Sequence, residues 1–178
     1  MIPLFLALAC APDDVTDDTG SPADTAETGD TGDTTDTGDT QDTGAGGSIV
    51  GDWLSEGANI APLLSGAPFN YVSIDAHFDA DLSYEVVATN ADGQTGTLTG
   101  TYVASDATTP GTITLSQATP YTATAEGIWQ IDGSTLTYEV VQVDPSYGFT
   151  PPTPESGFGT TAGDGIEPGE NVQVYVRQ

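Results

Sequence analysis

Basic side chains are almost missing from this sequence. Its 178 residues include 27 Asp and Glu but a single Lys or Arg, Arg177, so the formal net charge is -26. Proteins that bind DNA or RNA neutralise phosphates with clusters of Lys and Arg, so the composition excludes nucleic acid as a partner by that route. Phosphate-handling enzymes, dinucleotide-binding folds and peripheral binders of anionic lipid need cations for the same reason, and we expect none of them.

Cysteine and histidine are equally scarce. The chain has one Cys, Cys10, and one His, His77, which excludes a disulfide framework and a zinc site built from Cys and His. Any Ser-His triad would have to use His77. This residue lies near Asp75 and Asp79, but no Lys, free Cys or second His is present to complete a usual catalytic set. We therefore expect an exposed strand histidine, no enzyme activity and no cofactor.

Apolar side chains are missing from one long stretch. Residues 11–48 carry 11 of the acidic residues and one Val, and they contain no Leu, Ile, Met, Phe, Tyr, Trp, Lys or Arg. Ordering a chain costs roughly 1–2 kcal/mol per residue, and this stretch has almost no apolar surface to offset that cost. The composition predicts a disordered, extended acidic tether whose like charges repel one another.

Residues 1–10 form a short apolar run, MIPLFLALAC, that ends in small residues before Cys10. A helix of this length covers roughly half of a bilayer core of about 30 Å, so it is too short to cross the membrane. The run resembles the end of a bacterial lipoprotein signal peptide, in which the Cys is acylated and becomes the mature N-terminus. The resemblance implies a lipid anchor at Cys10 in the cell envelope, and Ala11 after the Cys points to the outer membrane. An ordinary hydrophobic terminus with an incidental Cys is the alternative.

Residues 49–178 have the composition of a folded domain of 130 residues, which is large enough for one core. Apolar and polar residues alternate in this part of the chain, and no window has a convincing helical period. In the second alternating segment we expect Val72, Ile74, Ala76 and Phe78 on the buried face and Tyr71 on the other. The alternation predicts eight strands, at 49–55, 71–78, 83–89, 97–104, 112–117, 125–131, 135–143 and 172–177.

Turn residues separate these segments, and Asp132-Gly133 is the strongest hairpin signal. Mostly short connections between consecutive strands favour an antiparallel sheet. Closing that sheet on itself removes the exposed edges that promote aggregation. We predict an all-β fold, an eight-stranded antiparallel up-and-down β-barrel preceded by the acidic tether. A β-sandwich is the alternative.

Three features of residues 49–178 resemble the lipocalin-like barrels found among small bacterial lipoproteins. They are Gly51-Asp52-Trp53 in the first strand, the repeated Gly-x-aromatic and Thr-Leu-Thr hairpins, and Arg177 in the last strand. In lipocalins the Trp closes one end of the barrel, and a basic residue of the final strand packs across it. The resemblance implies a cation-π contact between Trp53 and Arg177, worth about 0.5–2 kcal/mol. The alternative is that Arg177 is merely a charged residue near the C-terminus.

The connection at 144–170 is unusually long, and it contains aromatic residues that a fully solvated loop would not need. We expect it to fold over one mouth of the barrel as a lid, through Tyr147, Phe149 and Phe158. A ligand cavity at that mouth would be lined by inward-facing side chains, for which the candidates are Phe78, Tyr84, Tyr102 and Trp129. The alternative is a solid core, since an eight-stranded barrel is just wide enough for side chains to fill.

Calcium ligation at the turns is another hypothesis. Asp79, Asp81 and Asp92 lie in predicted turns and supply the hard oxygen atoms that Ca²⁺ prefers. Their spacing does not match an EF-hand, and turn formation explains each Asp without a metal.

These observations predict a lipid-anchored lipoprotein of the bacterial outer membrane with a monomeric barrel domain. We expect the barrel to bind a small apolar or neutral molecule without catalysis. The alternative is a structural or interaction module of the envelope that has no ligand and is assisted by calcium. A continuous cavity inside the barrel would favour binding, and a densely packed interior would favour the alternative.

Overall fold

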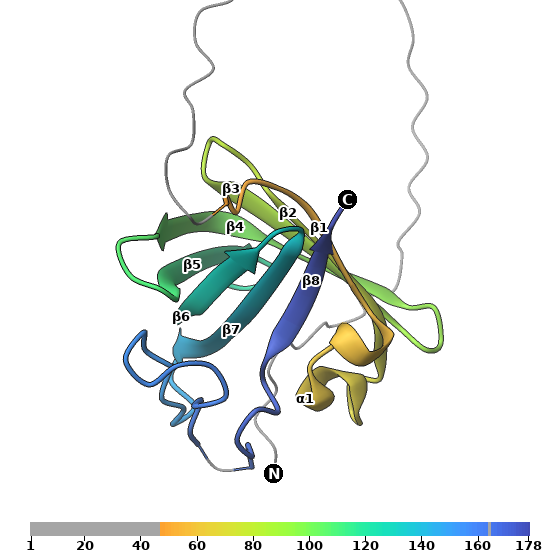
Figure 1. Ribbon diagram of the computed structural model, residues 1–178. Coiled ribbons are helices and arrows are strands. Elements are labelled where there is room, and N and C mark those ends of the chain that lie inside the picture. The colour runs from red at the N-terminus through yellow and green to blue at the C-terminus, as the bar shows by residue number, and fades with distance from the viewer. Residues whose placement is uncertain (1–46, 164) are drawn as a thin grey trace, which may run out of the picture.

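The predicted strands form one closed β-barrel (Figure 1). The computed structural model describes residues 47–163 and 165–178. The apolar lead, Cys10 and all but the last two residues of the predicted tether therefore lie outside the described residues. Each strand is antiparallel to the next, and the last strand pairs back onto the first. The predicted up-and-down barrel is confirmed, and the β-sandwich alternative is excluded.

The ends of the strands lie within two residues of the predicted ends. In chain order the strands are β1 (Gly51–Glu56), β2 (Tyr71–Phe78), β3 (Ser83–Asn90), β4 (Thr95–Ser105), β5 (Gly111–Thr119), β6 (Ala123–Asp132), β7 (Thr135–Asp144) and β8 (Gln173–Arg177). The β1–β2 connection contains two short helical turns that the alternation did not predict, η1 (Gly57–Asn59) and α1 (Pro62–Ser65). Within the described residues, no helix has the length and apolar character needed to cross a membrane.

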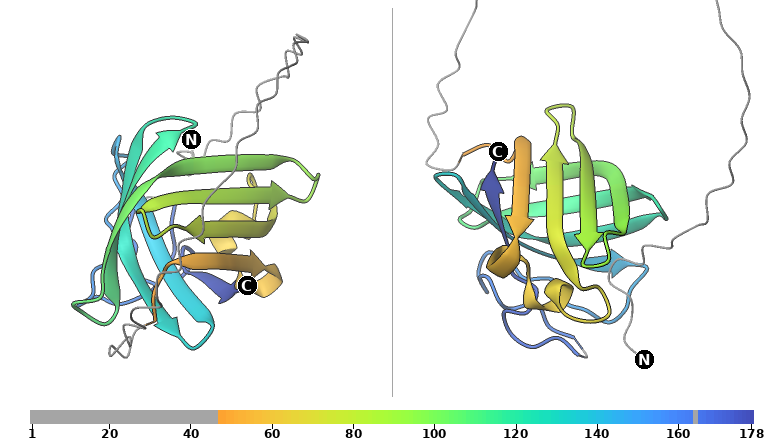
Figure 2. Two further views of the ribbon diagram at one scale, coloured as in Figure 1. Left: turned by 90° about the horizontal axis from the view of Figure 1, so that it is seen from above. Right: turned by 90° about the vertical axis from the view of Figure 1, so that its right-hand side faces the viewer.

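The two ends of the barrel are built differently, and we name each by a residue or element found there. At the Trp53 end lie the start of β1, the end of β8 and the β2–β3, β4–β5 and β6–β7 turns. At the α1 end lie α1 and the β3–β4, β5–β6 and β7–β8 connections. The right-hand view of Figure 2 shows α1 and the long β7–β8 connection below the strands, with the C-terminus at the opposite end.

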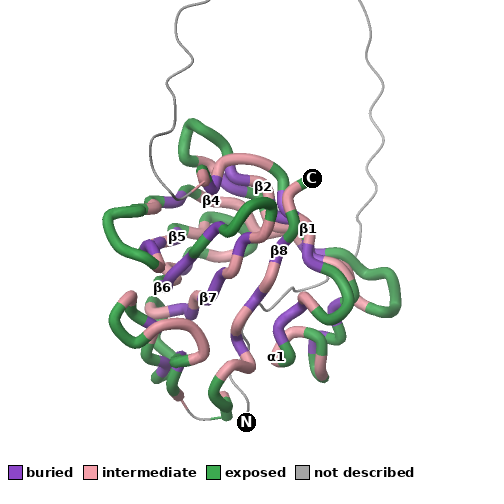
Figure 3. Tube along the Cα trace, in the orientation of Figure 1, coloured by how far each residue is buried: buried purple, intermediate pink, exposed green. Residues whose placement is uncertain are grey.

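Large side chains fill the Trp53 end. Trp53, Ile113 and Leu136 are at most 2% exposed and belong to one hydrophobic cluster. Full burial of such a side chain stabilises the fold by roughly 1.5–3 kcal/mol. The indole Nε1 of Trp53 donates a hydrogen bond to the Ile49 carbonyl at 2.7 Å, which satisfies its buried polar group. Figure 3 shows buried positions interleaved with less buried ones along the strands, as expected for a sheet with one inward face.

The start of β2 departs from the predicted alternation. Tyr71 is 6% exposed and Val72 is 49% exposed, the reverse of the expectation. Ile74, Ala76 and Phe78 do face inward as predicted. The register between β2 and β3 shifts between Tyr71 and Ser73, and an extra residue at such a bulge inverts the faces of the residues before it.

The long β7–β8 connection packs against the outer face of β7. Glu139 lies between the inward-facing residues Tyr138 and Val140, so its side chain points outward, yet it is 0% exposed. Its carboxylate accepts hydrogen bonds from the Gly159 amide at 2.5 Å and from the Thr161 amide and hydroxyl at 3.0 and 2.6 Å. This carboxylate fastens the connection to the barrel wall.

Candidate functional site

A cavity of about 160 Å³ lies inside the barrel, bordered by β2 to β8 and by Leu64 of α1. Four of its lining residues face inward but are only half-buried: Val86, Leu98, Ala125 and Val140. Inward-facing apolar side chains lose their exposure when neighbouring side chains fill the interior. The interior is therefore hollow toward the α1 end, and the solid-core alternative does not describe that part of the barrel.

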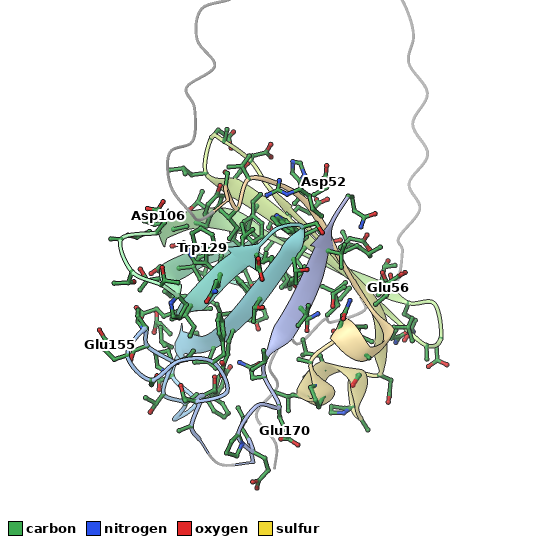
Figure 4. All side chains as sticks on the ribbon, in the orientation of Figure 1. Asp52, Glu56, Asp106, Trp129, Glu155 and Glu170 are labelled. Atoms are coloured by element: carbon green, nitrogen blue, oxygen red, sulfur yellow. The ribbon has the colours of Figure 1, made fainter. Side chains whose placement is uncertain are left out.

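The wall of the cavity carries no charge. Within the described part of the chain, the lining is apolar, aromatic and amide side chains, without Asp, Glu, Lys, Arg or His. In Figure 4 the labelled carboxylates Asp52, Glu56, Asp106 and Glu155 lie around the outside of the barrel. An uncharged wall can enclose and orient a neutral molecule without the cost of desolvating an unpaired charge.

Two of the four predicted cavity residues, Phe78 and Tyr84, line the cavity, and two do not. Tyr102 is buried, but its ring packs edge-on against Phe78 with 5.1 Å between centroids. Its hydroxyl donates to the Asp79 carbonyl at 2.8 Å. Trp129 is buried against Gly111, and its Nε1 donates to the Thr112 carbonyl at 3.1 Å. Tyr102 and Trp129 thus fill the Trp53 end instead of bordering the cavity.

Three tyrosines line the cavity with unpaired hydroxyl groups. Among the described residues, Tyr84, Tyr138 and Tyr175 form no hydrogen bond through their hydroxyls. They are 4%, 8% and 5% exposed. Every fully enclosed side-chain nitrogen or oxygen in the same part of the chain has a partner, so these hydroxyls border the cavity and are not sealed in the core.

Phenols are neutral at physiological pH, and burial raises the pKa values of these three further. Burial raises the pKa of Tyr84 to about 12. Burial also raises the pKa of Tyr138 well above its usual 10, and the neighbouring phenols of Tyr175 and Tyr84 raise it further. The pKa of Tyr175 is raised by burial and then by the charge of Asp75. All three side chains are therefore neutral hydrogen-bond donors at physiological pH.

Amide side chains surround the mouth of the cavity at the α1 end. Gln117 donates to the Tyr121 carbonyl at 2.8 Å, and Asn171 donates to the Val140 carbonyl at 2.7 Å. Gln173 accepts from the Ala61 amide at 2.8 Å and donates to the Ser55 hydroxyl at 2.5 Å. Because Ala61 precedes α1, Gln173 holds this connection against the barrel and places Leu64 in the cavity wall.

The aromatic residues predicted to form a lid lie elsewhere. None of Tyr147, Phe149 and Phe158 lines the cavity. Phe149 packs on Gly163, and Tyr147 is 43% exposed. The cause is the buried Glu139, which binds Gly159 and Thr161 and directs this connection onto the outer wall. Leu64 of α1 and the amide groups border the mouth instead.

The contact expected at the barrel seam is present. The guanidinium carbon of Arg177 lies 4.2 Å from the centroid of the Trp53 ring, and the two residues are register partners across β1 and β8. Arg177 also donates to the Val50 carbonyl at 3.0 Å and to the Ser48 carbonyl at 2.5 Å. One side chain thus connects the last strand to the chain segment that enters the first.

The three calcium candidates do not come together. Asp79 and Asp81 lie in the β2–β3 turn at the Trp53 end, whereas Asp92 lies in the β3–β4 turn at the other end of β3. Asp81 accepts hydrogen bonds from the amide and hydroxyl of Ser83, as expected for a turn residue. Across residues 47–163 and 165–178, no cluster of three or more His, Cys, Asp or Glu side chains could hold a metal.

His77 lies on the outer surface of β2 between two carboxylates. Its Nδ1 is 2.5 Å from Asp52 and its Nε2 is 3.1 Å from Asp79. These hydrogen bonds, first that with Asp52 and then that with Asp79, raise the pKa of His77 above its usual 6.5. The side chain is 44% exposed and faces away from the cavity, so it has no part in the interior site.

Three cavity tyrosines, Tyr121, Tyr138 and Tyr175, were missed as site residues. Tyr138 lies on the same face of β7 as Leu136 and Val140, and this spacing of two residues already indicated an inward position.

The chain matches no protein-family model, and no curated protein and no solved structure is detectably similar to it.

Proposed function

We propose that the protein is a lipid-anchored lipoprotein of the bacterial outer membrane whose lipocalin-like barrel binds a small, neutral and mainly apolar molecule without catalysis. The observation that carries the binding proposal is the hollow interior, with its half-buried apolar residues and uncharged wall. Ligand sites of this kind are concave and mostly apolar, with a few polar groups that fix orientation.

The volume of the cavity limits the size of the enclosed group. Its volume of about 160 Å³ is close to that of a roughly 150 Å³ engineered apolar cavity that binds benzene. Cavities for drug-sized ligands begin near 300 Å³. We infer a ligand, or an inserted part of one, about as large as one aromatic ring with a short substituent.

The proposed anchor depends on the sequence alone. Cys10 would carry the acyl chains, and the acidic tract at 11–48 would hold the barrel away from an anionic membrane surface. Labelling of host cells with a radioactive fatty acid tests this part separately. The protein should be labelled, and Cys10→Ser should abolish the label; an unlabelled native protein would contradict the anchor.

Native mass spectrometry of the protein purified from its own host tests the binding function. We expect a retained small molecule in the wild-type chain. Ala125→Phe places a ring among the cavity residues Leu98 and Val140 and should remove the bound mass. The matched control is Ala118→Phe, at an exposed position of β5, which should keep it. A mass retained equally by Ala125→Phe would contradict an interior site.

A further inference from the structure

The unpaired phenols inside the cavity define the ligand more closely, on the premise that the proposed binding function is correct. We propose that the ligand is a neutral, mainly apolar molecule with a hydrogen-bond acceptor, such as a carbonyl oxygen, which the hydroxyls of Tyr84, Tyr138 and Tyr175 bind. The acceptor would lie inside the barrel, and the apolar remainder would contact the wall toward the mouth.

The first support is that the hydroxyls of Tyr84, Tyr138 and Tyr175 form no hydrogen bond to the rest of the described fold. Each hydroxyl borders the cavity, so a phenylalanine would fill nearly the same volume of the core and lose no hydrogen bond to the protein. Two other tyrosines have partners: the hydroxyl of Tyr102 donates to the Asp79 carbonyl, and that of Tyr121, which also lines the cavity, donates to the Gln142 amide oxygen. The hydroxyl of the buried Tyr71, outside the cavity, forms no hydrogen bond within the described residues. Among the described residues, the hydroxyls of Tyr84, Tyr138 and Tyr175 form no such bond.

The second support is that the three groups converge from separate strands. Tyr84 belongs to β3, Tyr138 to β7 and Tyr175 to β8. The rings of Tyr138 and Tyr175 meet edge-on with 6.1 Å between centroids. Tyr84 lines the same cavity as these two rings. Three donors around one space suit a single acceptor atom with two lone pairs, or two acceptors close together.

Their position in the barrel gives the orientation of the ligand. Tyr84 is the second residue of β3, counted from the Trp53 end, and Tyr138 is the fourth of ten in β7 counted from the same end. The mouth, with Leu64 and the amide groups, lies at the other end. Because large side chains fill the Trp53 end, the ligand enters from the α1 end with its acceptor first.

The charges exclude ionic ligands. The only Lys or Arg of the chain, Arg177, is bound to Trp53 and to two carbonyls at the seam. Neither Arg177 nor His77 lines the cavity. An anion would enter an uncharged interior of a strongly acidic protein, with no countercharge to offset its desolvation. A quaternary cation would offer no lone pair to the phenol protons. A neutral molecule with an acceptor atom avoids the desolvation cost of a charge and still accepts hydrogen bonds from the phenols.

Calorimetric titration of the full chain at neutral pH with four probes of one skeleton tests the inference. Ethylbenzene is apolar, acetophenone adds a carbonyl to the same framework, and benzoate and benzyltrimethylammonium carry opposite charges. We expect acetophenone to bind on the order of 10-fold more tightly than ethylbenzene, as one added hydrogen bond would give. The two charged probes should bind more weakly than ethylbenzene.

Variants then test the tyrosines. Tyr138→Phe/Tyr175→Phe should lose the preference for acetophenone and keep the affinity for ethylbenzene. Tyr84→Phe, an independent single substitution, should reduce the preference if the double variant does not fold. Tyr147→Phe is the matched control, because Tyr147 is exposed and outside the cavity, and it should leave the preference unchanged.

The outcomes separate the ligand class from the binding function. Equal binding of ethylbenzene and acetophenone, or tightest binding of a charged probe, overturns the inference and leaves a binding barrel. A preference that persists in the phenylalanine variants overturns the assignment to the tyrosines. Failure of all four probes to bind contradicts the proposed interior binding function as well.

Discussion

Trp53 and Arg177 face each other across the seam of the barrel, with the guanidinium carbon 4.2 Å from the centre of the indole ring. They are register partners on β1 and β8, the two strands whose pairing closes the sheet. The same guanidinium donates to the carbonyls of Val50 and Ser48. The only Lys or Arg of the chain therefore stabilises the junction on which the interior cavity depends.

Arg177→Ala should lower the free energy of unfolding by about 1–3 kcal/mol, since it removes a cation-π contact and leaves a partly buried carbonyl without its donor. Arg177→Lys should lose part of this amount, because a lysine keeps the charge but not the fork of donors. Gln178→Ala, at the exposed neighbouring position, is the control. Urea unfolding measures the effect, and a loss below about 0.5 kcal/mol for Arg177→Ala would show that the seam does not need this side chain.

Glu139 should be essential for the placement of the β7–β8 connection. Glu139→Ala removes the acceptor for the buried donors of Gly159 and Thr161 and should destabilise the protein by about 2–4 kcal/mol. It should also make Phe149 and Phe158, which are buried and half-buried in the native protein, more accessible to chymotrypsin. Glu126→Ala, at an exposed position of the neighbouring strand β6, should change neither property. Equal cleavage of the two variants would contradict the anchoring role.

The hydrogen bonds of His77 should stabilise the folded protein at acidic pH, where the imidazole is protonated. Since Asp52 and Asp79 raise the pKa of His77 above 6.5, folding favours the protonated ring. This contribution is complete below pH 6.5 and is lost as the pH rises through the higher pKa of the folded state. The chain has a single His, so NMR titration of the imidazole is unambiguous. Asp52→Asn should lower the midpoint more than Asp79→Asn, and a midpoint at or below 6.5 in the native protein would disprove the interaction.

At the start of β2, Tyr71 is buried and Val72 is exposed, so substitutions of these two neighbours should differ in their effect on stability. Tyr71→Ser should destabilise the protein by about 3 kcal/mol, because this ring is buried and stacks on Phe69 with 5.7 Å between centroids. Val72→Ser should change the free energy of unfolding by less than about 0.5 kcal/mol, because Val72 is exposed. Thermal unfolding of the two variants compares them directly, and the opposite order would mean that the bulge is misplaced.

Much of the fold could be predicted because its signals are local. Alternation along residues 112–117 and 135–143 located β5 and β7, and Asp132-Gly133 located the hairpin between β6 and β7. The bulge beside Tyr71 could not be predicted, because it depends on the pairing with β3 and not on the composition of β2. The short turn α1 was also missed, since four residues are too few to show a helical period.

The site was less predictable because it depends on contacts between distant residues. Glu139 looks like an ordinary solvent-facing residue of an alternating strand, and its partners lie 20 and 22 residues further along the chain. Nothing local indicates that the connection will cover the outer wall and leave the mouth to α1. Tyr138 and Tyr175 could be placed inside the barrel by spacing, but the lack of partners for their hydroxyls appears only once all eight strands are arranged.

The central claim is that the hollow interior is a binding site. Methyl NMR of the full chain during titration with ethylbenzene tests it most directly, since each methyl group reports on its own surroundings. We predict saturable shifts for the inward methyls of Val86, Leu98 and Val140 and none for the exposed Val103. Unchanged inward methyls at saturating probe, or shifts confined to Val103, would contradict the claim.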